Sequence, residues 1–197
     1  LSAFNGHIII SHFDENESQV SVKPIDKNQD IYLNQHKVEG VKHVQAVAVK
    51  AGIIRNEKTF EGILFKGIGN DYKKDVFKEY LIEGRFPVLS SELNNEVVLS
   101  EYLANRLELK VGDTFNTFFM KENTNKLPNM RVFKLVGIFN SGFQEFDANY
   151  VLGDIRHVQK MNKWHANQIG HFEIFIDDFD DLEVMGNQIY EITPSDL

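Results

Sequence analysis

Two glycine-containing patterns in the chain have a spacing that could serve phosphate binding. Gly62 and Gly67 are spaced as in the loop that cradles nucleotide phosphates, but Ile68 stands where that loop requires a lysine. Gly67 and Gly69 begin the pattern of a dinucleotide-binding turn, yet Tyr72 occupies the position of its third glycine. We therefore interpret this segment as a strand that ends in a turn, and we predict that the chain neither binds nor hydrolyses ATP.

The histidines and acidic residues give little support for a metal site. The sequence contains no His-Glu-x-x-His pattern, and no two of its seven histidines have the i, i+4 spacing of a helical zinc site. Acidic residues crowd positions 177–183, but this run lacks the central glycine of a calcium-binding loop. We interpret the run as negative charge at the start of a helix, with a weak cation site as the alternative. The prediction is no metal and no cofactor.

Nucleophilic catalysis has no clear sequence signature either. The chain has no cysteine, which removes thiolate nucleophiles and disulfides together. Ser90 and Ser91 lie in a polar connection, and no Gly-x-Ser-x-Gly elbow is present. We predict that the chain has no catalytic residue and is not an enzyme.

The composition predicts a folded globular module. Of the 197 residues, 42% are hydrophobic and 25% are charged, which is ordinary for a packed domain. Lys and Arg number 21 against 29 Asp and Glu, and the net charge of −8 disfavours nucleic acid as a partner. No apolar run approaches the ~18 to 20 residues of a membrane helix. Because the chain begins at Leu1 and its first methionine is Met120, we expect it to be part of a longer protein with targeting or membrane segments elsewhere.

Hydrophobic periodicity and turn residues predict strands and helices that alternate irregularly. The expected strands are residues 7–13, 41–55, 59–68, 96–99, 114–120, 131–139, 150–152 and 171–176, with a short strand or an extended arm at 20–23. The expected helices are residues 31–39, 72–81 and 154–163, one helix capped by Ser100, and a last helix between Asp180 and Pro194. This pattern predicts an α+β fold with antiparallel or mixed sheets.

Several segments resemble one known family. Residues 97–113, VVLSEYLANRLELKVGD, are similar to the VVLS–LA–LGLKVGD signature of the MacB-like periplasmic core domain. Further similarities keep the order of the family: GVKHV at 40–44, GILFKGI at 62–68, EGRF at 83–86, FKLVGIF at 133–139 and YVL at 150–152. The family domain is the extracytoplasmic part of ABC transporter permeases of the lipoprotein-releasing LolC/LolE group and the efflux MacB group. The matched residues specify turns and strands, so the resemblance concerns architecture first.

The resemblance implies a two-lobed α+β domain on the periplasmic side of the inner (cytoplasmic) membrane. A membrane-proximal α/β lobe would be formed by both chain ends, residues 1–81 and 170–197, and an outer mixed-sheet lobe by residues 82–169. The N- and C-terminal segments would lie in the same lobe because both would lead to membrane helices. The implied partners are a cytoplasmic ATP-binding subunit and a second permease, and the domain itself would pass on motion rather than catalyse.

Three functions follow from the resemblance. Release of lipoproteins is favoured, MacB-type efflux of small molecules or peptides is the alternative, and FtsX-like regulation of a cell-wall hydrolase is the third. Lipoprotein cargo, a lipoprotein carrier or a membrane-fusion protein would then be a further partner. In the lipoprotein-releasing group one permease recruits the carrier through a long hairpin, whose counterpart at 121–131 is short here.

The loop between the strands at 114–120 and 131–139 is the candidate contact surface. Its residues 121–130 are mostly polar and cannot build a core. A solvated connector is one interpretation. The functional interpretation is that Leu127, Pro128 and Met130 contact a periplasmic partner or cargo, since an exposed Leu and Met can anchor in a groove and Pro reduces the cost of ordering.

Overall fold

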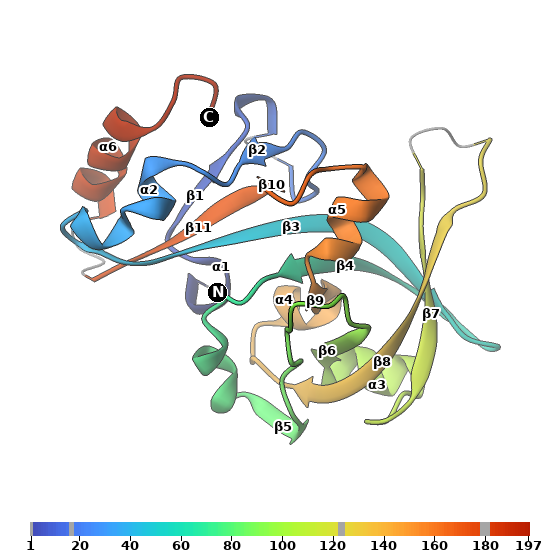
Figure 1. Ribbon diagram of the computed structural model, residues 1–197. Helices are drawn as coiled ribbons and strands as arrows, with labels where there is room; N and C mark the ends of the chain where they lie inside the picture. The colour runs from blue at the N-terminus through green and yellow to red at the C-terminus, as the bar shows by residue number, and fades with distance from the viewer. Residues whose placement is uncertain (1, 16–17, 122–124, 178–181) are drawn as a thin grey trace.

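The long strand β3 (Val41–Arg55) organises the computed structural model, which describes residues 2–15, 18–121, 125–177 and 182–197 (Figure 1). Its first half pairs antiparallel with β11 (His171–Ile176), and its second half pairs with β4 (Phe60–Ile68). The hairpin between β3 and β4 is closed by Asn56, whose side-chain oxygen accepts the backbone N–H groups of Lys58 and Thr59. The predicted hairpin over 41–55 and 59–68 is confirmed.

Six strands of the mixed sheet close into a ring. Strand β4 is followed around the ring by β9 (Tyr150–Asp154), β6 (Glu96–Ser100), β8 (Asn129–Phe139) and β7 (Thr114–Phe119), and β7 pairs again with β3. The pairs β4–β9 and β6–β8 are parallel and the others antiparallel. Strand β5 (Leu81–Gly84) pairs antiparallel with the C-terminal end of β8. The mixed α+β architecture is the predicted one.

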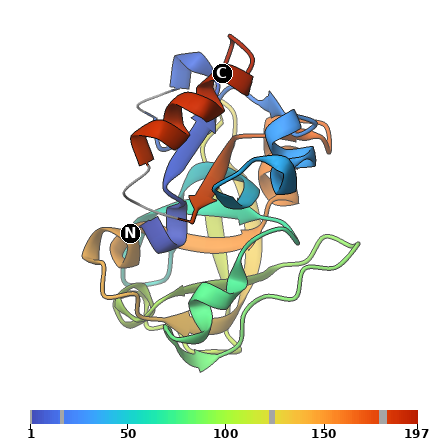
Figure 2. The ribbon, with the colours of Figure 1, turned by 90° about the vertical axis from the view of Figure 1, so that its left-hand side faces the viewer.

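Segments near the two ends of the chain are hydrogen-bonded to each other. Strand β1 (Ile8–Ser11) pairs antiparallel with β11, and the Phe13 N–H donates to the Asp196 carbonyl at 3.0 Å. Figure 2 shows β1, β11 and helix α6 (Leu182–Ile192) side by side in this region. The N- and C-terminal segments are thus paired with each other, and their placement in one lobe of a two-lobed domain remains a prediction. The cap expected at Asp180 lies outside the described residues.

Short elements complete this region of the domain. They are helix α1 (Ser2–Asn5), the 3-10 turns η1 (Phe13–Glu15) and η2 (Gln35–Lys37), helix α2 (Asp30–Leu33), and the paired strands β2 (Ile25–Asp26) and β10 (Gln168–Ile169). Residues 20–23 form the extended arm and not a strand. Ser21 fastens this arm to β3, because its N–H donates to the Val49 carbonyl and its Oγ accepts the Val49 N–H.

Three helices pack against the ring. Helix α3 (Glu101–Leu107) begins as predicted at Ser100, whose Oγ accepts the Leu103 N–H at 3.1 Å. Helix α5 (Arg156–Asn162) follows Asp154, whose carboxylate accepts the Arg156 N–H. Helix α4 (Gln144–Asn149) was not predicted. It places Phe146 in an aromatic cluster, stacked on Phe4 with ring centroids 4.7 Å apart.

Two predicted helices are wrong over most of their length. Within 72–81, only a 3-10 turn η3 (Lys74–Lys78) forms, because Tyr80 and the residues after it join β8: the Asn140 N–H donates to the Tyr80 carbonyl. Within 31–39, α2 stops at Leu33, because the Gln35 side chain turns to β3 and accepts the Val44 N–H at 2.9 Å. Tertiary hydrogen bonds override local helix propensity in both segments.

The ring combines strands from both predicted lobes. β3 and β4 belong to residues 1–81, whereas their neighbours β7 and β9 belong to residues 82–169, and the sheet runs through without a break. The lobe boundaries at 81/82 and 169/170 therefore remain predictions.

Candidate functional site

The three residues expected to contact a partner lie on the β7–β8 hairpin. The register of β7 and β8 ends with Phe119 opposite Asn129, and the hairpin projects from the ring (Figure 1). Leu127 is 85% exposed and Met130 50% exposed, while Pro128 is half-buried. The structure thus places an exposed apolar pair on this hairpin, where the sequence predicted it.

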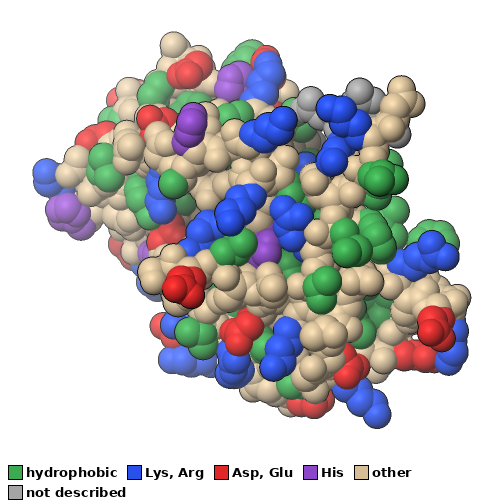
Figure 3. All heavy atoms as spheres, turned by 45° about the vertical axis from the view of Figure 1, so that its right-hand side comes forward, with side chains coloured by type: hydrophobic (Ala, Val, Ile, Leu, Met, Phe, Trp, Pro, Cys, Tyr) green, Lys and Arg blue, Asp and Glu red, His purple; other side chains and the backbone are tan. Residues whose placement is uncertain are grey.

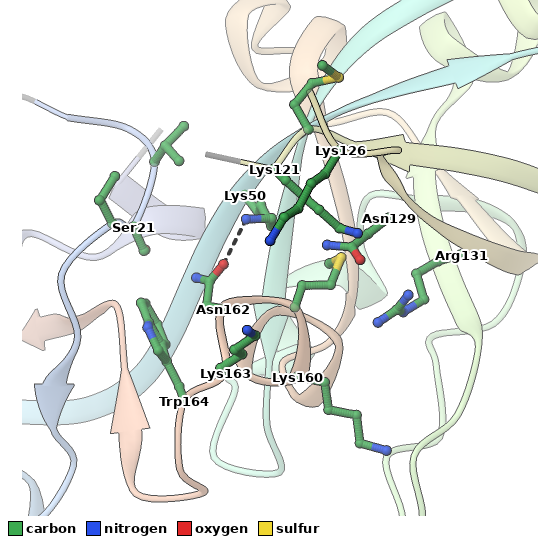
Figure 4. Close-up of a pocket in the computed structure, with 14 residues that line it drawn as sticks. Ser21, Lys50, Lys121, Lys126, Asn129, Arg131, Lys160, Asn162, Lys163 and Trp164 are labelled. Carbon is green, nitrogen blue, oxygen red and sulfur yellow. Dashed lines mark hydrogen bonds between the residues drawn. The ribbon is translucent and has the colours of Figure 1, made fainter. Parts of the chain in front are cut away.

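A cleft of about 540 Å³ opens beside the same hairpin. It lies between the hairpin, the middle of β3, the arm at 20–22 and the C-terminal end of α5 (Figure 4). We call it the basic cleft, because six cationic side chains line it: Lys50, Lys121, Lys126, Arg131, Lys160 and Lys163. Apolar contact surface comes from the side chains of Val20, Val22, Met120, Met161 and Trp164.

The basic cleft has a strongly positive lining. Among the described residues that line it, none is Asp or Glu. Within the described part of the chain, Lys121, Lys126, Arg131, Lys160 and Lys163 have no carboxylate within ion-pair distance. Figure 3, which brings this side forward, shows Lys and Arg side chains gathered across the face below the grey segment.

One titratable side chain close to the basic cleft has a shifted pKa. The pKa of His157, on α5, is lowered first by burial and further by the charges of Arg131 and Lys160. A hydrogen bond to the Asn94 carbonyl and the charge of Asp154 oppose this shift without reversing it. The protonated form of the His157 imidazole is therefore disfavoured, chiefly because the side chain is buried.

Local structure holds several lining residues in place. The Lys50 Nζ donates to the Asn162 Oδ1 at 2.7 Å, which ties the middle of β3 to the end of α5 (Figure 4). Lys163 ends α5 with a left-handed φ of 58°, and the next N–H, of Trp164, donates back to the Gln159 carbonyl. Arg131 is steadied by a hydrogen bond from its guanidinium to the Met130 carbonyl. These contacts give the basic cleft a preformed wall.

A second polar cluster lies buried where the N-terminal segment meets the sheet. The Nζ of Lys66, on β4, lies 2.5 Å from a carboxylate oxygen of Glu173, on β11, and both side chains are 1% exposed. The same Nζ donates to the Phe4 carbonyl and to the Asn5 Oδ1, and the Gln45 side chain donates to Glu173 at 2.9 Å. One ion pair thus joins the first residues of the chain to β3, β4 and β11.

The Lys66–Glu173 pair is held in the ionised form. Burial by itself raises the pKa of Glu173. The charge of Lys66 and the hydrogen bond from His171 outweigh burial, and together they lower the pKa to about 2. Burial lowers the pKa of Lys66, and Glu173 opposes this shift. Since the carboxylate has two charge-assisted partners and an amide donor, we assign charge to both members of the pair.

Neither cluster was predicted from sequence. The six cations of the basic cleft lie between positions 50 and 163, and the ring brings them together. Lys66 is a charged residue between apolar residues in the middle of a predicted strand. That pattern could have indicated a buried ion pair with an acidic residue. The described residues include no group of three or more His, Asp or Glu that could hold a metal ion.

The fold and the site define a mixed α+β domain with a closed six-stranded ring, joined chain ends and a basic cleft on one side. No helix in the described part of the chain combines the length and the apolar character that a membrane crossing requires. The sequence matches no protein-family model and no curated protein.

Two solved structures share this architecture. The periplasmic region of MacB from Actinobacillus actinomycetemcomitans matches with a TM-score of 0.58 and 19% identity, over 93% of this chain and 79% of that one. The extracellular domain of the noncanonic ABC-type transporter YknZ from Gram-positive bacteria matches with a TM-score of 0.55 and 16% identity, over 94% of each chain. The chain therefore has the MacB-like periplasmic core fold, as the sequence resemblance implied.

Proposed function

We propose that this chain is the extracytoplasmic domain of an ABC transporter permease. The observation that carries the proposal is the fold, which matches an ABC-type transporter domain over 94% of both chains. The domain would lie on the periplasmic side of the inner membrane and would work with a cytoplasmic ATP-binding subunit and a second permease. In this function it contributes no catalytic group and relays motion to the outer side of the membrane.

The contacts of the chain ends support such a relay. Phe4 and Asn5 are fastened to Lys66, and β1 is hydrogen-bonded to β11 along its length. Because β11 pairs with β3 and β3 belongs to the ring, a displacement of the N-terminal segment would act on the whole sheet. Packed elements of this kind move as rigid bodies rather than deform continuously.

The test uses the full-length gene product in membranes. It should purify from the inner membrane together with an ABC-type ATP-binding subunit, and deletion of residues 1–197 should abolish export while this assembly persists. Co-purification measures the assembly, and release of cargo from spheroplasts measures export. A full-length product that stays in the cytoplasm, or that never associates with such a subunit, would contradict the proposal.

For the cargo, we propose lipoprotein release first, on the motif resemblance. Efflux of the MacB type is the second candidate, favoured by the structural match to the MacB periplasmic region. Depletion of the full-length protein separates the two. Retention of lipoproteins in the inner membrane, measured by quantitative proteomics, supports release, whereas increased sensitivity to exported small molecules or peptides supports efflux. A change confined to cell-wall hydrolase activity would favour FtsX-like regulation instead.

We also propose that Leu127, Pro128 and Met130 contact the cargo or a periplasmic partner such as a carrier or a membrane-fusion protein. The proposal rests on the exposure of Leu127 and Met130 on a projecting hairpin. Leu127→Ser with Met130→Ser should reduce export and leave the fold and ATP-binding-subunit assembly unchanged. The matched control is Val88→Ser with Tyr190→Ser, two residues that are also well exposed. Normal export by the hairpin variant would show a plain connector.

A further inference from the structure

The basic cleft combines a cluster of cationic side chains with an apolar wall. The chain has 29 Asp and Glu residues against 21 Lys and Arg residues. Even so, six of the Lys and Arg residues line one cavity. The same cavity is lined by Trp164, Met120 and Met161. A surface that served only solubility would intersperse both signs of charge. The combination instead matches a ligand that has a negative group and an apolar part.

Helix electrostatics explain only part of this charge. Lys160 and Lys163 lie at the C-terminal end of α5, where cations complement the helix dipole. Lys50 lies on β3, Arg131 lies on β8, and Lys121 and Lys126 lie in the hairpin connection, where no such dipole acts. The helix dipole therefore does not explain why these four cations, on three separate chain segments, line the same cavity. Figure 4 shows the hairpin lysines and Lys50 near one another, with Arg131 to one side.

The size and chemistry of the cleft indicate a compact, multiply charged anion. A volume of about 540 Å³ suits a small molecule or a lipid headgroup and is within the usual range of ligand sites, roughly 300–1,000 Å³. Lysine ammonium groups bind phosphate as point charges, and arginine adds a planar donor set. A single carboxylate would bring one negative charge to a cleft lined by six cations. The aromatic and thioether side chains are suited to glycerol or acyl carbons.

We propose that the basic cleft binds a phosphate-bearing amphiphile, with the phosphate held by Lys50, Lys121, Lys126 and Arg131 and the apolar part against Trp164. A lipid headgroup and a free phosphate share this chemistry, and the probes below distinguish them. The inference goes beyond transport and does not depend on it, because its test uses the 197-residue chain alone.

The test uses Trp164, the single tryptophan of the chain, as the reporter. Its fluorescence is titrated with dihexanoyl phosphatidic acid below the micelle concentration, with dihexanoyl phosphatidylcholine, with inorganic phosphate and with a glutamate-rich octapeptide. Phosphatidic acid should bind at least about tenfold more tightly than the other three, and its affinity should fall as salt rises, because exposed charges are screened. Calorimetry repeats the measurement without the reporter.

Matched variants separate the cleft from general charge. Lys121→Gln, Lys126→Gln and Arg131→Gln together should weaken phosphatidic acid binding by about tenfold or more, since three charge-assisted contacts are lost. The control removes three exposed cations elsewhere, Lys37→Gln, Lys42→Gln and Lys110→Gln, with the same change in net charge and little change in affinity.

Each remaining outcome overturns a named part of the proposal. Equal loss in both variants would show general electrostatics and not a site. Equal binding of phosphatidylcholine would remove the role of the anionic phosphate, and equal binding of inorganic phosphate would remove the role of the apolar wall. Tighter binding of the acidic peptide would assign the basic cleft to a protein partner. Circular dichroism confirms that both variants are folded.

Discussion

Replacing Lys66 tests how the buried ion pair stabilises the domain. Lys66→Met keeps the approximate volume of the side chain but leaves the Glu173 carboxylate, 1% exposed, without its main counter-charge. Glu173 then retains the Gln45 amide at 2.9 Å and His171 at 3.5 Å. Removal of one partner of a buried pair typically costs about 3–5 kcal/mol. We expect Lys66→Met to lower the free energy of unfolding by an amount in this range.

The pKa of Glu173 leads to a similar magnitude. A folded pKa of about 2 against the usual 4.5 corresponds to about 3 kcal/mol of stabilisation at pH 7. Since the folded pKa is depressed, this contribution is complete above pH 4.5 and is lost as the pH falls toward 2. The stability gap between wild type and Glu173→Gln should therefore shrink by about 1 kcal/mol between pH 7 and pH 4, and by about 2 kcal/mol at pH 3.

Urea unfolding, followed by circular dichroism at pH 7, pH 4 and pH 3, measures both effects. The control is Lys58→Met, which removes a pair with Glu108 whose side chains are 73% and 62% exposed, and it should change stability by less than about 0.5 kcal/mol. The double variant with Lys66→Met and Glu173→Gln should recover at least about 1 kcal/mol relative to the sum of the single changes. If Lys66→Met matched Lys58→Met, or the Glu173→Gln gap did not vary with pH, the pair would not be ionised as assigned.

Three further changes test local features of the fold. Gly137→Ala would place a methyl group against the Arg85 carbonyl and should destabilise the domain by about 2–3 kcal/mol, which calorimetry would detect as a lower melting temperature. The control is Gly62→Ala, which has open space around it and should not lower the melting temperature. Ser100→Ala removes the cap of α3 and should cost about 1–2 kcal/mol in urea unfolding; no loss would show that the cap is dispensable. Arg156→Lys breaks donations to three carbonyl groups of the connection between β5 and β6, so amide exchange there should quicken, and unchanged exchange would contradict the pinning role.

The sequence by itself determined most strands and the mixed α+β architecture. Val-rich alternation predicted β3 over residues 41–55, and Ser100 predicted the start of α3, because both signals depend on the backbone within a few residues. The exposed hairpin residues were also identified in advance, since a polar loop between two strands has few ways to be buried.

Only the tertiary structure decided which distant residues meet. The helix predicted over 72–81 gave way to a 3-10 turn and β5, because pairing with β8 was available. Lys66 and Glu173 are 107 positions apart, and only the packing of β4 and β11 around β3 makes them an ion pair. The basic cleft likewise arises from ring closure, which brings Lys50 on β3, Arg131 on β8 and Lys163 beside the same cavity. Long-range charge clusters leave no periodic signal along a chain, because they depend on register and strand order rather than on neighbouring residues.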